Sequence, residues 1–317
     1  MSILIYGGGA VGLGLASCLL KSGQQVDIIA REATKLCLEK DGLARTGIFG
    51  EYHAAPRTFG CVTELDSLQE GPYDAVLVCT KSYDSLTAAQ DIAQHPEILD
   101  KNSKIILFQN GWGNAEIFAH QLPDEDIYNA RVITGFCRPQ QNQVDITVHV
   151  EAIHVGSIFG AGLAEVENIC QGISQGGISC EITPEIEKDL WAKLLFNCAL
   201  NPLGAIFNVP YGTLAEQEYT KGIMNGVIAE IFKVMEAAGY QTHWPDAGAY
   251  QEAFYSRIVP LAAKHKSSTL QDIHAGKKTE IDALNGAIMQ LGLEHGIAVP
   301  SNTMLWNMIK FMEQQMG

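Results

Sequence analysis

The first thirty residues constrain the fold of this chain more than any other stretch. Residues 3–6 form a short apolar run, glycine-rich residues 7–12 follow, and residues 13–21 show a helical pattern that Gly23 ends. This order predicts a strand, a tight glycine turn and a helix, and residues 26–30 then read as a second parallel strand. Such a unit is typical of an open α/β sheet covered by helices.

The glycine turn has the spacing of a dinucleotide-binding loop. Gly7, Gly9 and Gly12 fit the pattern in which glycines allow a tight turn, a close approach of pyrophosphate to the backbone, and packing of the helix on the strand. The helix N-terminus would then face the phosphates with its N–H groups. A purely structural turn is the alternative. The predicted cofactor loop comprises Gly7, Gly8, Gly9, Ala10, Val11 and Gly12.

The end of the second predicted strand indicates which dinucleotide is bound. An NAD enzyme would carry an acidic residue there for the ribose hydroxyls, whereas this chain has Arg31. A guanidinium matches a 2′-phosphate bidentately, so NADP is favoured. Glu32 follows immediately, and the preference would weaken or reverse if Glu32 faced the ribose.

Two further strand ends carry polar side chains at the edge where such sheets bind ligands. Lys81 follows the apolar run 74–79, and Asn110 follows the run 104–108. A surface lysine and an Asn-Gly turn are the ordinary interpretations of these residues. Because both fall at the same edge as the glycine loop, we expect them to belong to a site.

A polar stripe runs along an apolar segment near the middle of the chain. Lys193, Asn197 and Asn201 are spaced four residues apart, so they lie on one face of a predicted helix whose other positions are suited to burial. Desolvation lowers the pKa of a lysine and makes it a plausible proton donor, while asparagines can bind a small polar molecule. A snorkelling lysine with two structural amides is the alternative.

Together these residues resemble the ketopantoate reductase (2-dehydropantoate 2-reductase) family over nearly the whole chain. The glycine loop is shared with every Rossmann-type dehydrogenase, whereas the blocks around Lys193 and Glu280 are specific to the family. The matching blocks are residues 7–12 with Arg31, 79–82, 109–113, 190–203, 267–272, 279–282, 285–286 and 295–300.

The resemblance implies a role for each matching residue. Lys193 would be the general acid, and Glu280 would be a second catalytic residue that holds the lysine and the substrate. The residues implied to bind the oxo acid are Asn110, Asn197, Asn201 and Ser268, and those implied to bind the cofactor with the glycine loop are Arg31, Lys81 and Asn110.

The implied activity is NADPH-dependent reduction of 2-dehydropantoate (ketopantoate) to pantoate in pantothenate and coenzyme A biosynthesis. The protein would then be an oxidoreductase acting on a CH–OH donor. Two alternatives stay open: an NADPH-dependent reductase of another small 2-oxo acid, and a non-catalytic NADP(H)-binding redox sensor. Ionisable residues at both 193 and 280 count against the sensor, which would require neither.

Two of these residues also have structural interpretations of their own. Ser268 with Gln271 has capping-box spacing, so it could simply start a helix. Glu280 begins an amphipathic run, and a carboxylate there needs a partner because an unpaired buried charge is expensive. Lys193 is the expected partner, although a helix dipole could also stabilise Glu280.

The pattern predicts two domains. Residues 1–182 would form an NADP-binding Rossmann-type domain, and residues 183–317 would form a helical substrate and catalytic domain that starts at Thr183 and Pro184 as N-cap and first helical residue. Pro202 should bend or interrupt the long helix, because proline lacks the backbone N–H.

Composition narrows the partners and the compartment. The formal net charge of −15 argues against nucleic acid and anionic membranes, so an anionic 2-oxo acid and NADP must be drawn by local cations. The eight cysteines are scattered as expected for reduced thiols, and no metal-ligand spacing is present. We expect no leader and no apolar stretch near membrane-spanning length, hence a cytoplasmic protein, with a homodimer open as its oligomeric state.

Overall fold

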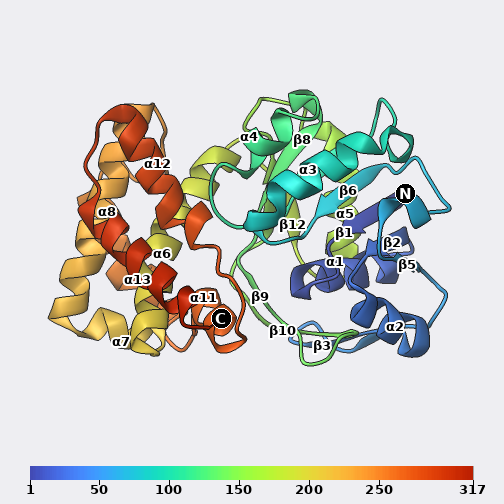
Figure 1. The fold of residues 1–317 in the computed structure, drawn as a ribbon, viewed down its shortest axis with the longest axis horizontal. Coiled ribbons are helices and arrows are strands. Elements are labelled where there is room, and N and C mark those ends of the chain that lie inside the picture. The colour runs from blue at the N-terminus through green and yellow to red at the C-terminus, as the bar shows by residue number, and fades with distance from the viewer. Residues whose placement is uncertain (317) are drawn as a thin grey trace. The chain divides into compact units, whose positions relative to one another are not determined.

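The computed structural model describes residues 1–316 and divides the chain into two compact units (Figure 1). The first comprises Met1–Gln109 and Asn114–Ile186, and the second comprises Asn110–Gly113 and Glu187–Gly317. The sequence pattern did not indicate that the short segment Asn110–Gly113 belongs with the second unit. This grouping places Asn110 in the same unit as Lys193 and Glu280.

An eight-stranded sheet forms the centre of the first unit. Its order is β12-β11-β8-β7-β6-β1-β2-β5, and all neighbouring strands are parallel except β8 and β11. Its strands are β1 (Ser2–Tyr6), β2 (Gln25–Ile29), β5 (Gly60–Val62), β6 (Ala75–Val78), β7 (Lys104–Leu107), β8 (Ile127–Arg131), β11 (Ile153–Gly156) and β12 (Cys180–Ile182). The strand order reverses between β1 and β6, which is where open α/β sheets bind ligands.

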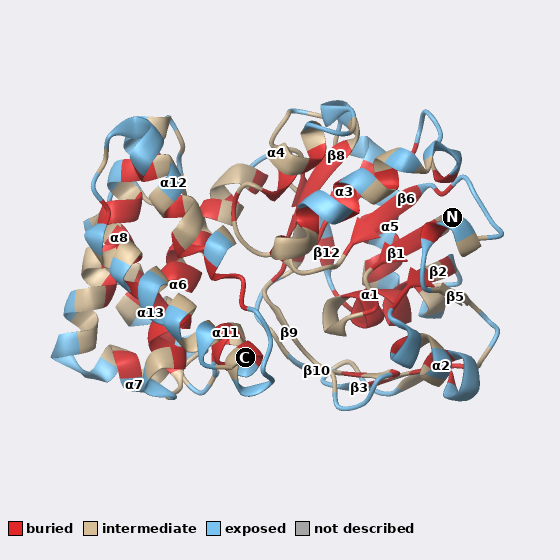
Figure 2. Cartoon of the chain, viewed as in Figure 1, coloured by how far each residue is buried: buried red, intermediate tan, exposed pale blue. Residues whose placement is uncertain are grey.

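Alternate side chains of β1 enter two separate cores. Ile3 and Ile5 pack with residues of α1 (Ala10–Lys21) and α5 (Ala164–Gln175), whereas Leu4 and Tyr6 pack with residues of α3 (Ser85–Gln94) and α4 (Asn114–Ala119). Both faces of the sheet are therefore covered, and Figure 2 shows its central strands as buried. This arrangement is the reason that the strands read as continuous apolar runs.

A smaller sheet of order β4-β3-β10-β9 completes the first unit. Its strands are β3 (Leu43–Gly47), β4 (Tyr52–Ala54), β9 (Thr134–Cys137) and β10 (Gln143–His149). The turn from β9 to β10 meets the start of α2 (Glu32–Asp41), since Thr34 Oγ1 donates to Gln141 Oε1 at 3.0 Å.

The second unit consists of helices and loops in its described residues, which confirms the predicted fold class of a Rossmann-type domain followed by a helical one. Its helices are α6 (Ile186–Phe207), α7 (Tyr211–Glu216), α8 (Glu218–Ala238), α9 (Ala247–Ala253), α10 (Val259–Leu261), α11 (Ser268–His274), α12 (Asn285–His295) and α13 (Pro300–Gln314). Their core includes Trp191, Leu195 and Leu200 of α6 with Val227 and Ile231 of α8.

Helix α6 corrects three predictions. It begins at Ile186 instead of Pro184, and it is not interrupted at Pro202, which was one of the two effects expected of that proline. It is also long and apolar enough to cross a membrane, so the prediction that no stretch approaches that length was wrong. Lys193 and the asparagines do not offset the apolar residues between them, and 67% of the apolar stretch is buried within the protein.

The carbonyl that Pro202 leaves without a helical partner is bound by a side chain. In an uninterrupted helix the N–H of residue 202 would donate to Cys198 O, and proline has no N–H. Asn285 Nδ2 donates to Cys198 O instead, at 3.2 Å. Asn285 and Asn302 are fully buried and joined to each other by a hydrogen bond of 3.0 Å. These contacts explain how a proline is accommodated in the middle of the helix.

Candidate active site

The polar stripe lies on α6 as its spacing predicts. Lys193 is half-buried, whereas Asn197 and Asn201 are 9% and 2% exposed. The neighbouring Leu194 and Leu195 are buried in the helical core. The packing of the apolar residues thus fixes the rotation of the helix and the direction of the stripe.

Asn110 joins the two residues that were expected to be catalytic. Lys193 Nζ donates to Asn110 Oδ1 at 2.5 Å, and Asn110 Nδ2 donates to Glu280 Oε2 at 3.2 Å. The amide therefore uses its acceptor for the ammonium and its donor for the carboxylate, which fixes its orientation. All three side chains belong to the second unit.

Aromatic packing holds the segment that carries Asn110. Gly111 has a φ of +90°, and a Cβ there would come within 2.4 Å of Ala283 O, so only glycine fits. The next residue, Trp112, donates its backbone N–H to Ala283 O at 2.9 Å. Its ring lies 4.7 Å from that of Trp191 and 4.9 Å from that of Tyr240. The residues that follow Asn110 are therefore packed against the helical core.

Glu280 lies just before a short 3₁₀ helix, Ile281–Ala283, and not at the start of an amphipathic helix. Helix α12 begins five residues later, at Asn285. Glu280 is 5% exposed. The preceding Thr279 is held by Glu313, whose Oε1 accepts from Thr279 N and Oγ1, both at 2.7 Å. The backbone around the buried carboxylate is thus fixed from α13.

A buried tyrosine orients the amide of Asn201. Tyr211 donates its hydroxyl to Asn201 Oδ1 at 2.5 Å. Burial raises the pKa of Tyr211, so the hydroxyl keeps its proton. No hydrogen bond from Asn201 Nδ2 is found within residues 1–316, which leaves that amino group to a ligand. An amino group there would favour an acceptor such as a carboxylate.

At the start of α11, the residue that caps the helix is Ser267 and not Ser268 as predicted. Ser267 is the N-cap, because its Oγ accepts from Leu270 N at 3.0 Å, and Ser268 is the first helical residue. The capping assignment to Ser268 was therefore wrong by one residue. Ser267 also donates to Asn201 O at 3.0 Å, which brings the start of α11 to the polar stripe.

The predicted cofactor loop in the first unit leaves room for a pyrophosphate. Gly9 is the N-cap of α1, and a Cβ at Gly9 would meet no atom within 4 Å. At Gly12 a Cβ would lie 2.1 Å from Gly7 O, so helix and turn are in close contact there. The open space at Gly9 faces a helix N-terminus, whose first N–H groups have no helical partners. The loop residues therefore fit a dinucleotide.

The other predicted cofactor residues follow β2 and β6, the two strands that flank β1 in the same sheet. Arg31 follows β2 as the exposed N-cap of α2, with Glu32 in the first turn. Lys81 follows β6, and Gln109 Nε2 donates to Lys81 O at 3.3 Å and to Thr80 Oγ1 at 3.2 Å. A Cβ at Gly7 would lie 2.9 Å from Thr80 N, so the glycine loop and the end of β6 are adjacent.

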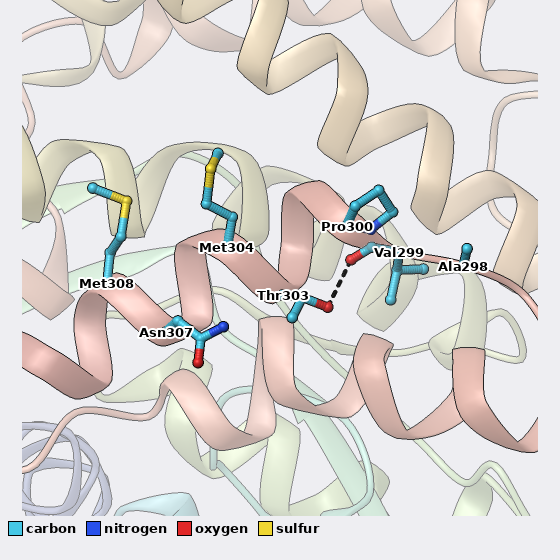
Figure 3. A pocket seen from close by; sticks show the side chains of 7 residues that line it. All are labelled: Ala298, Val299, Pro300, Thr303, Met304, Asn307 and Met308. Carbon is cyan, nitrogen blue, oxygen red and sulfur yellow. Dashed lines mark hydrogen bonds between the residues drawn. The ribbon is translucent and has the colours of Figure 1, made fainter.

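A surface hollow on α13 lies apart from these residues (Figure 3). It is lined by Ala298, Val299, Pro300, Thr303, Met304, Asn307 and Met308. The Thr303 hydroxyl donates a hydrogen bond to Val299 O at 2.9 Å. None of the lining residues is ionisable. The hollow contains no acid–base group and none of the predicted site residues.

Sequence patterns missed Tyr211 and Ser267 as parts of the site. Tyr211 follows Asn201 by ten residues, and its contact depends on how the chain returns after α6. Ser267 was passed over because Ser268 has the better capping-box spacing with Gln271.

Comparison with protein families gives matches over both units. The family described as ketopantoate reductase PanE/ApbA matches residues 3–163, and its C-terminal model, ketopantoate reductase PanE/ApbA C terminal, matches residues 185–313. The two ranges together contain every predicted site residue.

Full-length relatives agree with these matches. A 2-dehydropantoate 2-reductase of Aquifex aeolicus is 33% identical over 99% of this chain and 97% of its own length. The crystal structure of a PanE/ApbA family ketopantoate reductase from Ralstonia eutropha has a TM-score of 0.85 at 28% identity, covering 100% of this chain and 99% of that one. A D-mandelate dehydrogenase bound to NADH and anilino(oxo)acetate shares the fold, with a TM-score of 0.86 at 24% identity, covering 100% and 99%. The chain therefore belongs to the ketopantoate reductase family.

Proposed function

We propose that this protein reduces 2-dehydropantoate (ketopantoate) to pantoate with NADPH, a step in pantothenate and coenzyme A biosynthesis. The observation that carries the proposal is the convergence of Lys193, Asn110 and Glu280. It places a cationic proton donor, a neutral amide and a carboxylate together in a family of reductases.

The glycine loop, Arg31 and Lys81 would hold the cofactor, which would supply a hydride for the ketone carbon of the substrate. Lys193 donates a proton to the carbonyl oxygen, so that the ketone gains two electrons and two hydrogens and becomes an alcohol. Asn110 accepts from the ammonium and holds it in place at 2.5 Å. Glu280 fixes the other end of the amide and binds the substrate's hydroxyl.

The amides of the stripe recognise the acid end of the substrate. Asn201 offers its amino group because Tyr211 occupies its oxygen. Asn197 is buried and makes no side-chain hydrogen bond within the described residues, so its donor and acceptor are both left to a ligand. Ser268, at the start of α11, adds a hydroxyl. Three neutral groups and one cation suit a small anion.

NADPH is proposed over NADH because of Arg31. Arg31 makes no ion pair within residues 1–316, so its guanidinium is available to a 2′-phosphate. Glu32 is exposed in the same helical turn and is the residue that would favour NADH. The D-mandelate dehydrogenase with the same fold was crystallised with NADH, so the fold itself does not exclude NADH.

A side-by-side rate comparison tests the substrate. The loss of NADPH absorbance is followed with ketopantoate and with 2-oxoisovalerate, which lacks the terminal hydroxyl. A site built to bind that hydroxyl should favour ketopantoate by up to about ten-thousand-fold in kcat/KM. A preference for 2-oxoisovalerate would leave a reductase of another oxo acid. Binding of NADPH without oxidation across a panel of oxo acids would favour the redox sensor.

The setting of the reaction is proposed on separate grounds. The eight cysteines are unpaired thiols, as in a reducing cytoplasm. The net charge of −15 disfavours nucleic acid and anionic membrane surfaces as partners. The homodimer stays a prediction that light scattering would test.

A further inference from the structure

Arg138 is a half-buried cation whose hydrogen bonds all go to neutral oxygens. It lies in the turn between β9 and β10, where its Nη2 donates to Gln141 O at 2.8 Å and its Nε to the same oxygen at 3.3 Å. Nη2 also donates to Thr34 Oγ1. Within residues 1–316 no carboxylate forms an ion pair with Arg138.

These bonds place Arg138 at the start of α2. Thr34 belongs to the first turn of that helix, and its backbone N–H donates to Arg31 O at 2.8 Å. Thr34 Oγ1 donates in turn to Gln141 Oε1 at 3.0 Å. The β9–β10 turn is therefore fastened to the helical turn that Arg31 begins.

This placement is electrostatically unfavourable without an anion. The N-terminus of a helix carries a partial positive charge, which repels cations. Burial lowers the pKa of Arg138, Cys37 opposes this shift, and the nearby positive charge of Arg31 adds to it. Two guanidiniums and a helix N-terminus thus meet in one place, with only neutral acceptors bound to Arg138 and no ion pair on Arg31 in the described chain.

We propose that Arg138 and Arg31 together bind the 2′-phosphate of NADPH, so that Arg138 is a second determinant of cofactor specificity. The inference rests on the proposed NADPH dependence. A phosphate monoester carries a charge of about −1.5 to −2 at neutral pH and has three acceptor oxygens. It matches two planar guanidinium forks and the N–H groups at a helix start. Gln141 and Thr34 hold Nε and Nη2 of Arg138, which orients the rest of the guanidinium for the phosphate.

The test compares cofactor affinities of Arg138→Gln and a matched variant in the full-length protein. Lys40→Gln removes one positive charge from the last turn of the same helix and serves as the control. Dissociation constants for NADPH and NADH are measured by titration. Arg138→Gln should weaken NADPH about ten- to a hundred-fold, as expected for a charge-assisted bond to phosphate, and NADH hardly at all. Lys40→Gln should change neither.

The outcomes separate this proposal from the one it rests on. If the wild type prefers NADPH and Arg138→Gln weakens both cofactors equally, Arg138 only braces the turn and the proposal fails while NADPH dependence stands. An equal selective loss in Lys40→Gln would reduce the effect to net charge and also overturn it. A wild type that binds NADH as tightly as NADPH overturns both proposals. If Arg138→Gln does not fold, Arg138→Lys replaces it, and unchanged NADPH affinity in that variant refutes a bidentate role.

Discussion

Replacing Tyr211 by phenylalanine tests whether a buried hydroxyl sets the orientation of the Asn201 amide, which we propose binds the substrate. Tyr211 donates to Asn201 Oδ1 at 2.5 Å, and Asn201 is 2% exposed. Phenylalanine keeps the ring, whose centroid lies 5.4 Å from that of Phe196. The substitution therefore removes one hydrogen bond and little packing.

The size of the effect follows from the burial of both partners. Loss of the donor leaves a buried acceptor unpaired, which costs about 1 to 3 kcal/mol in all. With a total near 2 kcal/mol, rotation of the Asn201 amide would become easy. Its oxygen would then face the substrate carboxylate and repel it, so KM should rise by up to about thirty-fold. The value of kcat should change little, since Lys193 and Asn110 are untouched.

Tyr250→Phe is the matched control. Tyr250 is fully buried in the same helical core, and its hydroxyl has no hydrogen-bond partner in the described structure. Its removal should be neutral or stabilising. Urea unfolding and initial rates with the oxo acid are measured for both variants. Equal KM values and equal unfolding free energies for the two would refute the role assigned to the Tyr211 hydroxyl.

Three further expectations can be measured with the same protein. Arg31→Ala should weaken NADPH about ten- to a hundred-fold and NADH far less, whereas equal losses in a titration would remove Arg31 from the phosphate site. Lys193→Ala should lower kcat about a hundred- to ten-thousand-fold with cofactor affinity preserved, and near-normal turnover would show a merely snorkelling lysine. Burial lowers the pKa of His265 in the folded protein. In the unfolded chain its pKa is about 6.5, so as pH falls the unfolded form binds a proton before the folded form does. The free energy of unfolding that neutral His265 contributes above pH ~6.5 is therefore lost as pH falls below that value. His265→Gln should show a smaller fall in Tm than the wild type between pH ~7 and ~5. Equal falls in Tm would contradict the lowered pKa of His265.

Features set by neighbouring residues could be predicted from the sequence. The glycine loop depends on backbone geometry within six residues, and the stripe of Lys193, Asn197 and Asn201 depends only on helical periodicity. These local rules were enough for the fold class and for the helix that carries the stripe.

Contacts made across the fold could not be predicted in this way. Arg138 meets Thr34 across 104 residues, and Asn110 meets Glu280 across 170, so neither pair leaves a local pattern. The position of Ser267 failed for a smaller reason, because two adjacent serines compete for one cap. Such contacts form only when distant segments of the chain pack together in the sheet and in the helical core.

The anchoring of Trp112 among Trp191 and Tyr240 bears on how this family can recombine. Consider a hybrid whose first 186 residues come from one relative and whose remaining residues come from another. Its segment 110–113, with the tryptophan, would come from one parent, and the helical core that packs around this segment would come from the other. That hybrid would also inherit its Asn110 from a different parent than its Lys193. A functional exchange of the first unit should therefore need crossovers on both sides of Asn110–Gly113, so that this segment stays with the helical unit.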